Sequence, residues 1–151
     1  MHSLVRRYLK TAIGFLLLGL VLGGWMMVRR ELYGVYATTY ETSAHTHAIL
    51  VGFVMLMIQG VALWLFPRPE RGDTSYRPAI AGAAYWLVTI GTAARVLGEL
   101  ARPNLDAAWL RAAVTLAGII QIAGIALFFY TMWSRIRPAG SQVREAKGER
   151  F

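Results

Sequence analysis

The sequence predicts an all-α integral membrane protein, a bundle of four transmembrane helices with both termini in the cytoplasm. The first observation behind this prediction is composition: 56% of the 151 residues are hydrophobic and 16% are charged, whereas charged residues make up about 25% of an ordinary soluble domain. The second is a set of four apolar stretches, each about 20 residues long, the length that crosses a bilayer. We expect residues 1–138 to form this one domain and residues 139–151 to be a polar, disordered tail.

The third observation is the placement of the positive charge. The formal net charge is +8, but most basic residues flank apolar stretches, where they orient membrane helices and need no nucleic acid partner. Eleven of the 16 Lys and Arg residues lie in the N-terminal segment, the second loop and the tail, which predicts that these parts are cytoplasmic. The chain has no cysteine, so disulfides, thiolate metal sites and c-type haem are excluded.

The first two helices are expected at about residues 9–28 and 44–66. A signal peptide has a shorter apolar core and a small-residue cleavage site, whereas the first stretch here ends in bulky residues and two arginines. Within it, Gly19 and Gly23 have the GxxxG spacing that lets helices approach closely. We expect Thr42 or Ser43 to cap the second helix.

The last two helices are expected at about residues 79–100 and 107–134. The third contains many Gly and Ala residues, which suits tight helix packing. Gln121 lies near the middle of the fourth helix, where an amide is expected to join it to a neighbouring helix.

The candidate site is the pair His45 and His47 at the N-terminal end of the second helix. Ionisable side chains inside a membrane span are costly and usually mark function. Residues that are two positions apart on a helix point about 200° apart, so the two rings cannot face the same metal ion. His45 lies above small residues, including Gly52, which leave room for a flat macrocycle or a close neighbouring helix. His45 is therefore the first choice as a ligand.

His47 lies above aliphatic residues, and it can serve a second metal, a hydrogen bond or a different subunit. The simpler alternative is that both histidines only settle at the membrane interface. Two arginines at the same level, Arg95 and Arg111, either bind the propionates of a haem or extend to the membrane surface. Copper is a weaker alternative to haem, because Glu41 is the nearest carboxylate and Glu31, Glu99 and Asp106 would have to fold in.

The run AHTHAILVGFVMLMIQGVALWLFPR resembles the second helix of haem-copper oxidase catalytic subunits, most closely the cbb-type oxidases and nitric oxide reductases. In those proteins a His-Thr pair near the outer end of this helix provides an axial ligand to low-spin haem b. The run is also similar to NnrS-type membrane haem proteins, which carry a His-x-His followed by a Gly-Phe pair, here Gly52 and Phe53. The first resemblance places the ligand on His45, and the second leaves His47 open.

The chain resembles one repeat of that architecture, whose subunits have about twelve helices in three four-helix units. It lacks the histidine cluster of the catalytic centre, so alone it is not expected to be an oxygen or nitric oxide reductase. The resemblance implies a b-type haem protein of a bacterial or archaeal inner membrane, acting in electron transfer or in binding a diatomic gas. A homo-oligomer, dimer or trimer, or a larger respiratory complex would provide missing ligands. The alternative is a cofactor-free accessory or assembly subunit of a respiratory complex.

Overall fold

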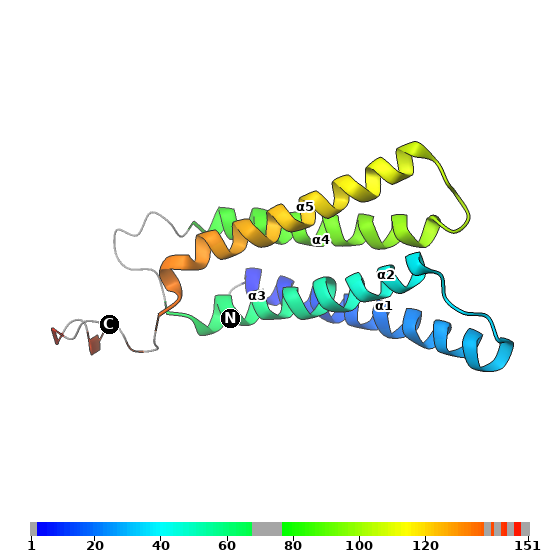
Figure 1. The fold of residues 1–151 in the computed structure, drawn as a ribbon. Helices are drawn as coiled ribbons and strands as arrows, with labels where there is room; N and C mark the ends of the chain where they lie inside the picture. The colour runs from blue at the N-terminus through cyan, green and yellow to red at the C-terminus, as the bar shows by residue number, and fades with distance from the viewer. Residues whose placement is uncertain (1–2, 68–76, 138–139, 141–142, 145–146, 149–151) are drawn as a thin grey trace.

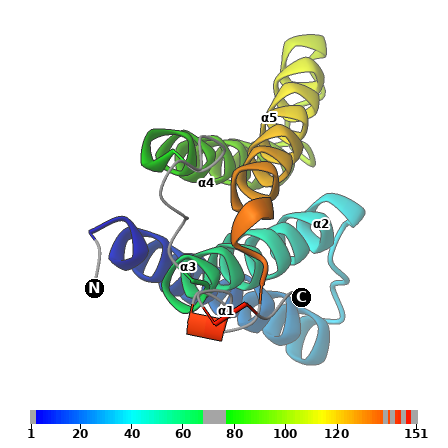
Figure 2. The same ribbon diagram turned by 90° about the vertical axis from the view of Figure 1, so that its left-hand side faces the viewer.

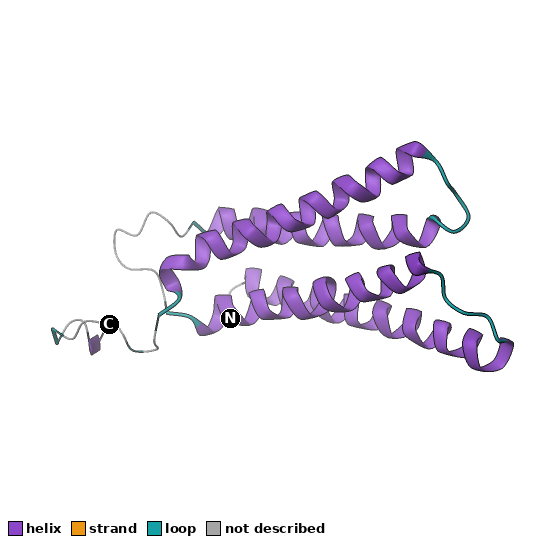
Figure 3. Cartoon of the chain, in the orientation of Figure 1, coloured by secondary structure: helices purple, strands orange, loops and turns teal. Residues whose placement is uncertain are grey.

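The computed structural model shows an all-α bundle of four long helices (Figure 1), which confirms the predicted fold class. It describes residues 3–67, 77–137, 140, 143–144 and 147–148, and these form helices and no strands (Figure 3). Four continuous helical stretches are long and apolar enough to cross a membrane: α1 (Ser3–Tyr33), Thr39–Leu65, α4 (Pro78–Ala101) and α5 (Ala108–Met132) with the 3₁₀ turn Trp133–Arg135. The chain is therefore a multi-pass membrane protein.

The first two helices are longer than predicted because their ends are set by local hydrogen bonds. α1 continues past the predicted end at residue 28 to Tyr33, where Gly34 adopts a φ of +64°, a left-handed conformation that often terminates helices. The second helix begins at Thr39, and its cap is Thr38 in a capping box with Glu41. The prediction that Thr42 or Ser43 caps this helix was therefore wrong. Most of the predicted tail, 139–151, lies outside the described residues.

The second helix changes its geometry near its own midpoint. It consists of α2 (Thr39–His47), a π-helical segment (Ala48–Met55) and α3 (Leu56–Leu65). In an α-helix, every fourth residue is rotated by about 40° around the helix axis relative to the one before. The π-helix has a wider turn, which offsets this rotation. The π segment thus keeps a row of every-fourth residues buried against other helices, namely Ala44, Ala48, Gly52, Leu56 and Gly60.

Glycines let the helices approach in two pairs, which Figure 2 shows end-on. In α1, a Cβ atom on Gly19 would lie 2.3 Å from the Ile49 side chain, and one on Gly23 would lie 2.9 Å from the His45 ring. In the α4–α5 pair, a Cβ atom on Gly91 would lie 2.9 Å from the backbone of α5. The GxxxG of the first helix therefore packs against the second helix of the same chain.

The two pairs are joined at the end of the bundle that carries the chain termini, called the inner end below. Tyr8 of α1 lies between Tyr85 of α4 and Phe128 of α5, with ring centroids 5.0 and 5.8 Å away, and its hydroxyl donates to the Ala81 carbonyl at 3.0 Å. Buried Arg135 donates to the carbonyls at the end of α3, including Leu63 at 3.1 Å. At the opposite, outer end, the start of α5 projects away from α1 and α2 (Figure 2).

Candidate functional site

The two histidines lie on opposite sides of α2, as the helix spacing predicts. His45 faces α1, where its ring contacts Gly23, and His47 faces α4, where it contacts Glu99. The two rings therefore belong to two separate sites near the outer end of the bundle.

The ring of His45 is oriented by the backbone of α1. Its Nδ1 lies 2.9 Å from the carbonyl oxygen of Gly19, and a carbonyl only accepts, so Nδ1 carries the hydrogen. Nε2 then keeps its lone pair, the usual arrangement for a histidine that binds a metal or haem iron. The ring fits because residue 23 is glycine: the Cβ of any other residue would lie 2.9 Å from Cε1.

A pocket of about 370 Å³ lies beside the His45 ring between α1, α2 and their connection. α1 contributes Gly23, Met26 and Arg30 to its wall, and the connection contributes Tyr36. The pocket thus combines an imidazole, a thioether, a guanidinium and a phenol. Of these groups, imidazole is a ligand of haem iron, and guanidinium binds carboxylates such as the haem propionates.

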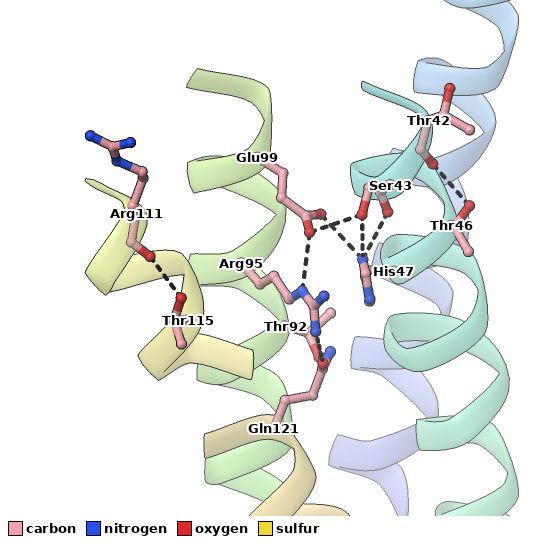
Figure 4. A network of polar contacts seen from close by, with 10 residues as sticks. All are labelled: Thr42, Ser43, Thr46, His47, Thr92, Arg95, Glu99, Arg111, Thr115 and Gln121. Atoms are coloured by element: carbon pink, nitrogen blue, oxygen red, sulfur yellow. Dashed lines mark hydrogen bonds and ion pairs between the residues drawn. The ribbon is translucent and has the colours of Figure 1, made fainter. Parts of the chain in front are cut away.

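His47 belongs to a polar cluster between α2 and α4 (Figure 4). Its Nδ1 lies 2.9 Å from the Ser43 carbonyl and 3.2 Å from Oε2 of Glu99. The Ser43 hydroxyl donates to Oε1 of Glu99 at 2.9 Å, and Nε of Arg95 donates to the same oxygen at 3.1 Å. The Glu99 side chain is only 5% exposed, so an ion pair and hydrogen bonds compensate its buried charge.

The polar cluster orients His47 but is not built for nucleophilic catalysis. In a Ser-His-acid triad, the serine and the acid use opposite ring nitrogens. Here Ser43 and Glu99 both lie against Nδ1 of His47, and Figure 4 shows the other ring nitrogen pointing away from both. As in His45, the second nitrogen is left for another partner.

The cluster continues into the packing of α4 on α5. Nη1 of Arg95 lies 3.4 Å from Oε1 of Gln121, and Nε2 of Gln121 donates to the Thr92 hydroxyl at 2.9 Å. Thr92 and Gln121 are buried. Gln121 therefore joins two helices, in the way that its place in the sequence suggested.

Two of the predicted site residues lie outside both histidine sites. Gly52 packs against Phe15 of α1, and a Cβ atom there would lie 2.4 Å from that ring. The small face below His45 is thus filled by the neighbouring helix, which leaves no macrocycle space beside Gly52. Arg111 is exposed, lies 3.7 Å from Asp106 and points away from the polar cluster (Figure 4).

The carboxylates do not gather around either histidine as a metal site. Glu41 caps α2 and pairs with Arg29, while Glu31 pairs with Arg30. Glu99 does fold in, beside His47. Within the described part of the chain, no three residues of the types His, Cys, Asp and Glu form a group that could hold a metal ion.

Glu99 was expected only as a remote carboxylate, and Met26 and Arg30 were not assigned to a site, although the spacing of these residues carried a signal. Arg95 and Glu99 are four apart, so they share a helix face and form an ion pair. Met26 and Arg30 continue the glycine face of α1 at helical spacing. These patterns do not by themselves place Glu99 beside His47, because the sequence does not show that α4 faces α2.

Comparisons of the chain with protein-family models, with curated proteins and with solved structures found no match. The function is therefore argued from the geometry of the two histidine sites.

Proposed function

We propose that this chain is a membrane protein that binds b-type haem through Nε2 of His45, and that it acts in electron transfer or in binding a diatomic gas. The observation that carries the proposal is the hydrogen bond from His45 Nδ1 to the Gly19 carbonyl, at 2.9 Å. It orients the ring plane, and in the neutral imidazole it leaves the lone pair on Nε2, on a ring that lines a pocket. When bound, the haem would supply one-electron redox chemistry or an open coordination position.

The rest of the pocket supports haem over a bare metal ion. Arg30 and Tyr36 lie where α1 ends and the connection begins, near the expected membrane surface, where propionates are best solvated. Copper would require further ligands, and no carboxylate contacts His45 in the described residues, which makes copper the weaker candidate.

His45 is preferred to His47 as a ligand because the two rings have different surroundings. His47 is held in the polar cluster, with its Nδ1 against Ser43 and Glu99. The ring of His45 lines a pocket together with Arg30, whose guanidinium can bind a propionate. We therefore assign His45 to the iron and His47 to joining α2 with α4.

An optical spectrum of the detergent-purified protein, oxidised and reduced, tests this proposal. We expect a b-type spectrum in the wild type and in His47→Ala, and its loss in His45→Ala. His47→Ala is the matched control, because it removes the same ring two residues away. A colourless wild type, even after haem is supplied during expression, would refute haem binding and favour a cofactor-free accessory subunit.

We further propose that a second copy of the chain covers the polar cluster. Arg95 lies six residues before the end of α4, about 9 Å inside the helix, yet its side chain is 26% exposed. A guanidinium exposed to lipid at that depth is costly, which favours a partner that covers it. Mass measurement of the detergent-solubilised protein should give a dimer or trimer, and Arg95→Leu should alter its assembly. A strictly monomeric wild type would refute a second copy at the polar cluster. A larger complex with other proteins in native membranes would also refute it and would assign the cover to another subunit.

The proposed location is the inner membrane of a bacterial or archaeal cell, with both termini in the cytoplasm. The support is the excess of Lys and Arg in the terminal segments and second loop. Reporter fusions at both termini would show the orientation, and a periplasmic or extracellular reporter signal would reverse it.

A further inference from the structure

The carboxylates of the chain are distributed unevenly between the two ends of the bundle. In the described part of the chain, every carboxylate lies at the outer end and pairs with an arginine there, namely Glu31, Glu41, Glu99 and Asp106. The inner end carries exposed cations that no carboxylate of the described residues contacts, namely Arg6, Arg7, Lys10 and Arg77. An anion that neutralises these inner cations therefore comes from outside the described chain.

Three of these cations share one face of α1 with exposed apolar residues. This inner α1 face lies within an arc of about 120° and consists of Arg6, Arg7, Lys10, Ile13, Gly14 and Leu17. Ile13 and Leu17 are 48% and 59% exposed, and a Cβ atom on Gly14 would meet nothing within 4 Å. The buried residues of α1, including Tyr8 and Phe15, lie on the opposite side. The described residues therefore leave the inner α1 face uncovered.

The order of charge and apolar surface along this face matches a phospholipid. Lys10 is followed by about 10 Å of apolar helix to Leu17, which reaches well into one leaflet of a hydrocarbon core about 30 Å thick. Gly14 leaves a depression in which an acyl chain can lie close to the backbone. The cations lie near the positive end of the helix dipole, and the first turn of α1 has no acidic residue, so a phosphate is stabilised there.

We propose that the inner α1 face binds an anionic phospholipid of the leaflet at the inner end. The phosphate lies against Arg6, Arg7 and Lys10, and one acyl chain lies along Ile13, Gly14 and Leu17. Basic residues near a membrane surface each strengthen the binding of anionic lipid by about fivefold. This inference goes beyond the proposed function and depends neither on haem nor on a second copy of the chain.

Native mass spectrometry of the full-length, detergent-solubilised protein tests this, by titration with phosphatidylglycerol and with phosphatidylcholine of identical chains. We expect the wild type to retain one phosphatidylglycerol per chain and to prefer it to phosphatidylcholine. The variant Arg6→Gln/Arg7→Gln/Lys10→Gln should raise the apparent Kd for phosphatidylglycerol about 100-fold, at about fivefold per charge. The matched control, Arg144→Gln/Lys147→Gln/Arg150→Gln, removes three cations from the C-terminal tail and should bind as the wild type does.

A second pair of variants tests the acyl-chain part of the face without changing its charge, and it remains informative if the triple variant fails to fold. Gly14→Leu fills the depression and should weaken the binding of phosphatidylglycerol. Gly24→Leu also adds a side chain at an open position, but about 15 Å further along α1, at the level of the other leaflet. Gly24→Leu should therefore bind as the wild type does, and equal binding by both variants would refute the acyl-chain contact.

Three other results would overturn the proposal. Equal retention of the two lipids, or an equal loss in the triple variant and in the tail control, would show that the inner α1 face has no lipid site of its own. Displacement of the lipid by soluble glycerol phosphate would assign the cations to a free phosphate. Loss of a dimer in Gly14→Leu, with lipid binding unchanged, would assign the face to a second copy of the chain.

Discussion

The fit of the His45 ring against α1 can be tested by adding a single methyl group. Gly23 and Gly24 are adjacent in the same helix, but a Cβ atom on Gly23 would lie 2.9 Å from Cε1 of His45, whereas one on Gly24 meets nothing within 4 Å. Gly23→Ala must therefore move the imidazole, and Gly24→Ala changes only the helix backbone. The pair isolates the contact between α1 and the histidine.

The expected magnitudes follow from the structure. Gly24→Ala should stabilise the protein by about 0.5–1 kcal/mol, because alanine loses less backbone entropy in a helix. Gly23→Ala has the same gain, but it overpacks the contact at a cost of about 1–3 kcal/mol and disturbs the hydrogen bond to Gly19, worth about 1 kcal/mol. The net effect should be a destabilisation of about 1–3 kcal/mol.

The assay is reversible unfolding in mixed detergent micelles, followed by circular dichroism on both variants and the wild type. Under the proposed function, the spectrum of the protein supplied with haem provides an independent readout, because a displaced ring should weaken the haem absorbance in Gly23→Ala only. Equal stability and equal haem content in Gly23→Ala and Gly24→Ala would show that the ring of His45 does not lie on Gly23.

Three further perturbations test the polar contacts. Glu99→Gln removes the charge that pairs with Arg95 and should lower the free energy of unfolding by about 2 kcal/mol; no change in detergent unfolding would contradict the buried ion pair. Thr92→Val removes the buried acceptor of Gln121, with an expected loss of about 1 kcal/mol. The double variant Thr92→Val/Gln121→Leu should lose less than the two single variants together, and strict additivity would show that the contact is absent. A hydrogen bond from an arginine lowers the pKa of exposed Asp106, so its stabilising effect is present above the ordinary pKa and lost as the pH falls through the lowered value. The thermal midpoint of the wild type should exceed that of Asp106→Asn at a pH of about 7, and the difference should shrink as the pH falls below the ordinary pKa of an aspartate. A pH-independent difference would refute the assignment.

The number and type of the helices were predictable because membrane spans are long and continuously apolar. Their ends were less predictable, since they depend on contacts that single residues make. Thr38 and Glu41 cap α2, but the sequence also offers Thr42 and Ser43 as caps, and both instead lie inside the helix. The π-helical turn after His47 left no recognisable pattern, because its residues are apolar on all sides.

The candidate site was predictable in part. The residue spacing placed the two histidines on opposite faces, and the structure has them there. The residue spacing did not reveal that Phe15 of α1 packs against Gly52 and fills the space there. The residue spacing also did not distinguish Arg95, which joins the polar cluster, from Arg111, which points away from that cluster.

The sequence alone determined that four helices cross a membrane and that His45 and His47 point in different directions near one end. Both follow from local properties, namely the apolar length of a span and the angle between positions on one helix. The tertiary structure decided which helix lies opposite each ring: Gly19 and Gly23 of α1 beside His45, and Glu99 of α4 beside His47. Hydrophobic periodicity cannot supply this information, because lipid and the interior of the bundle are equally apolar and only close packing and hydrogen bonds select the neighbours.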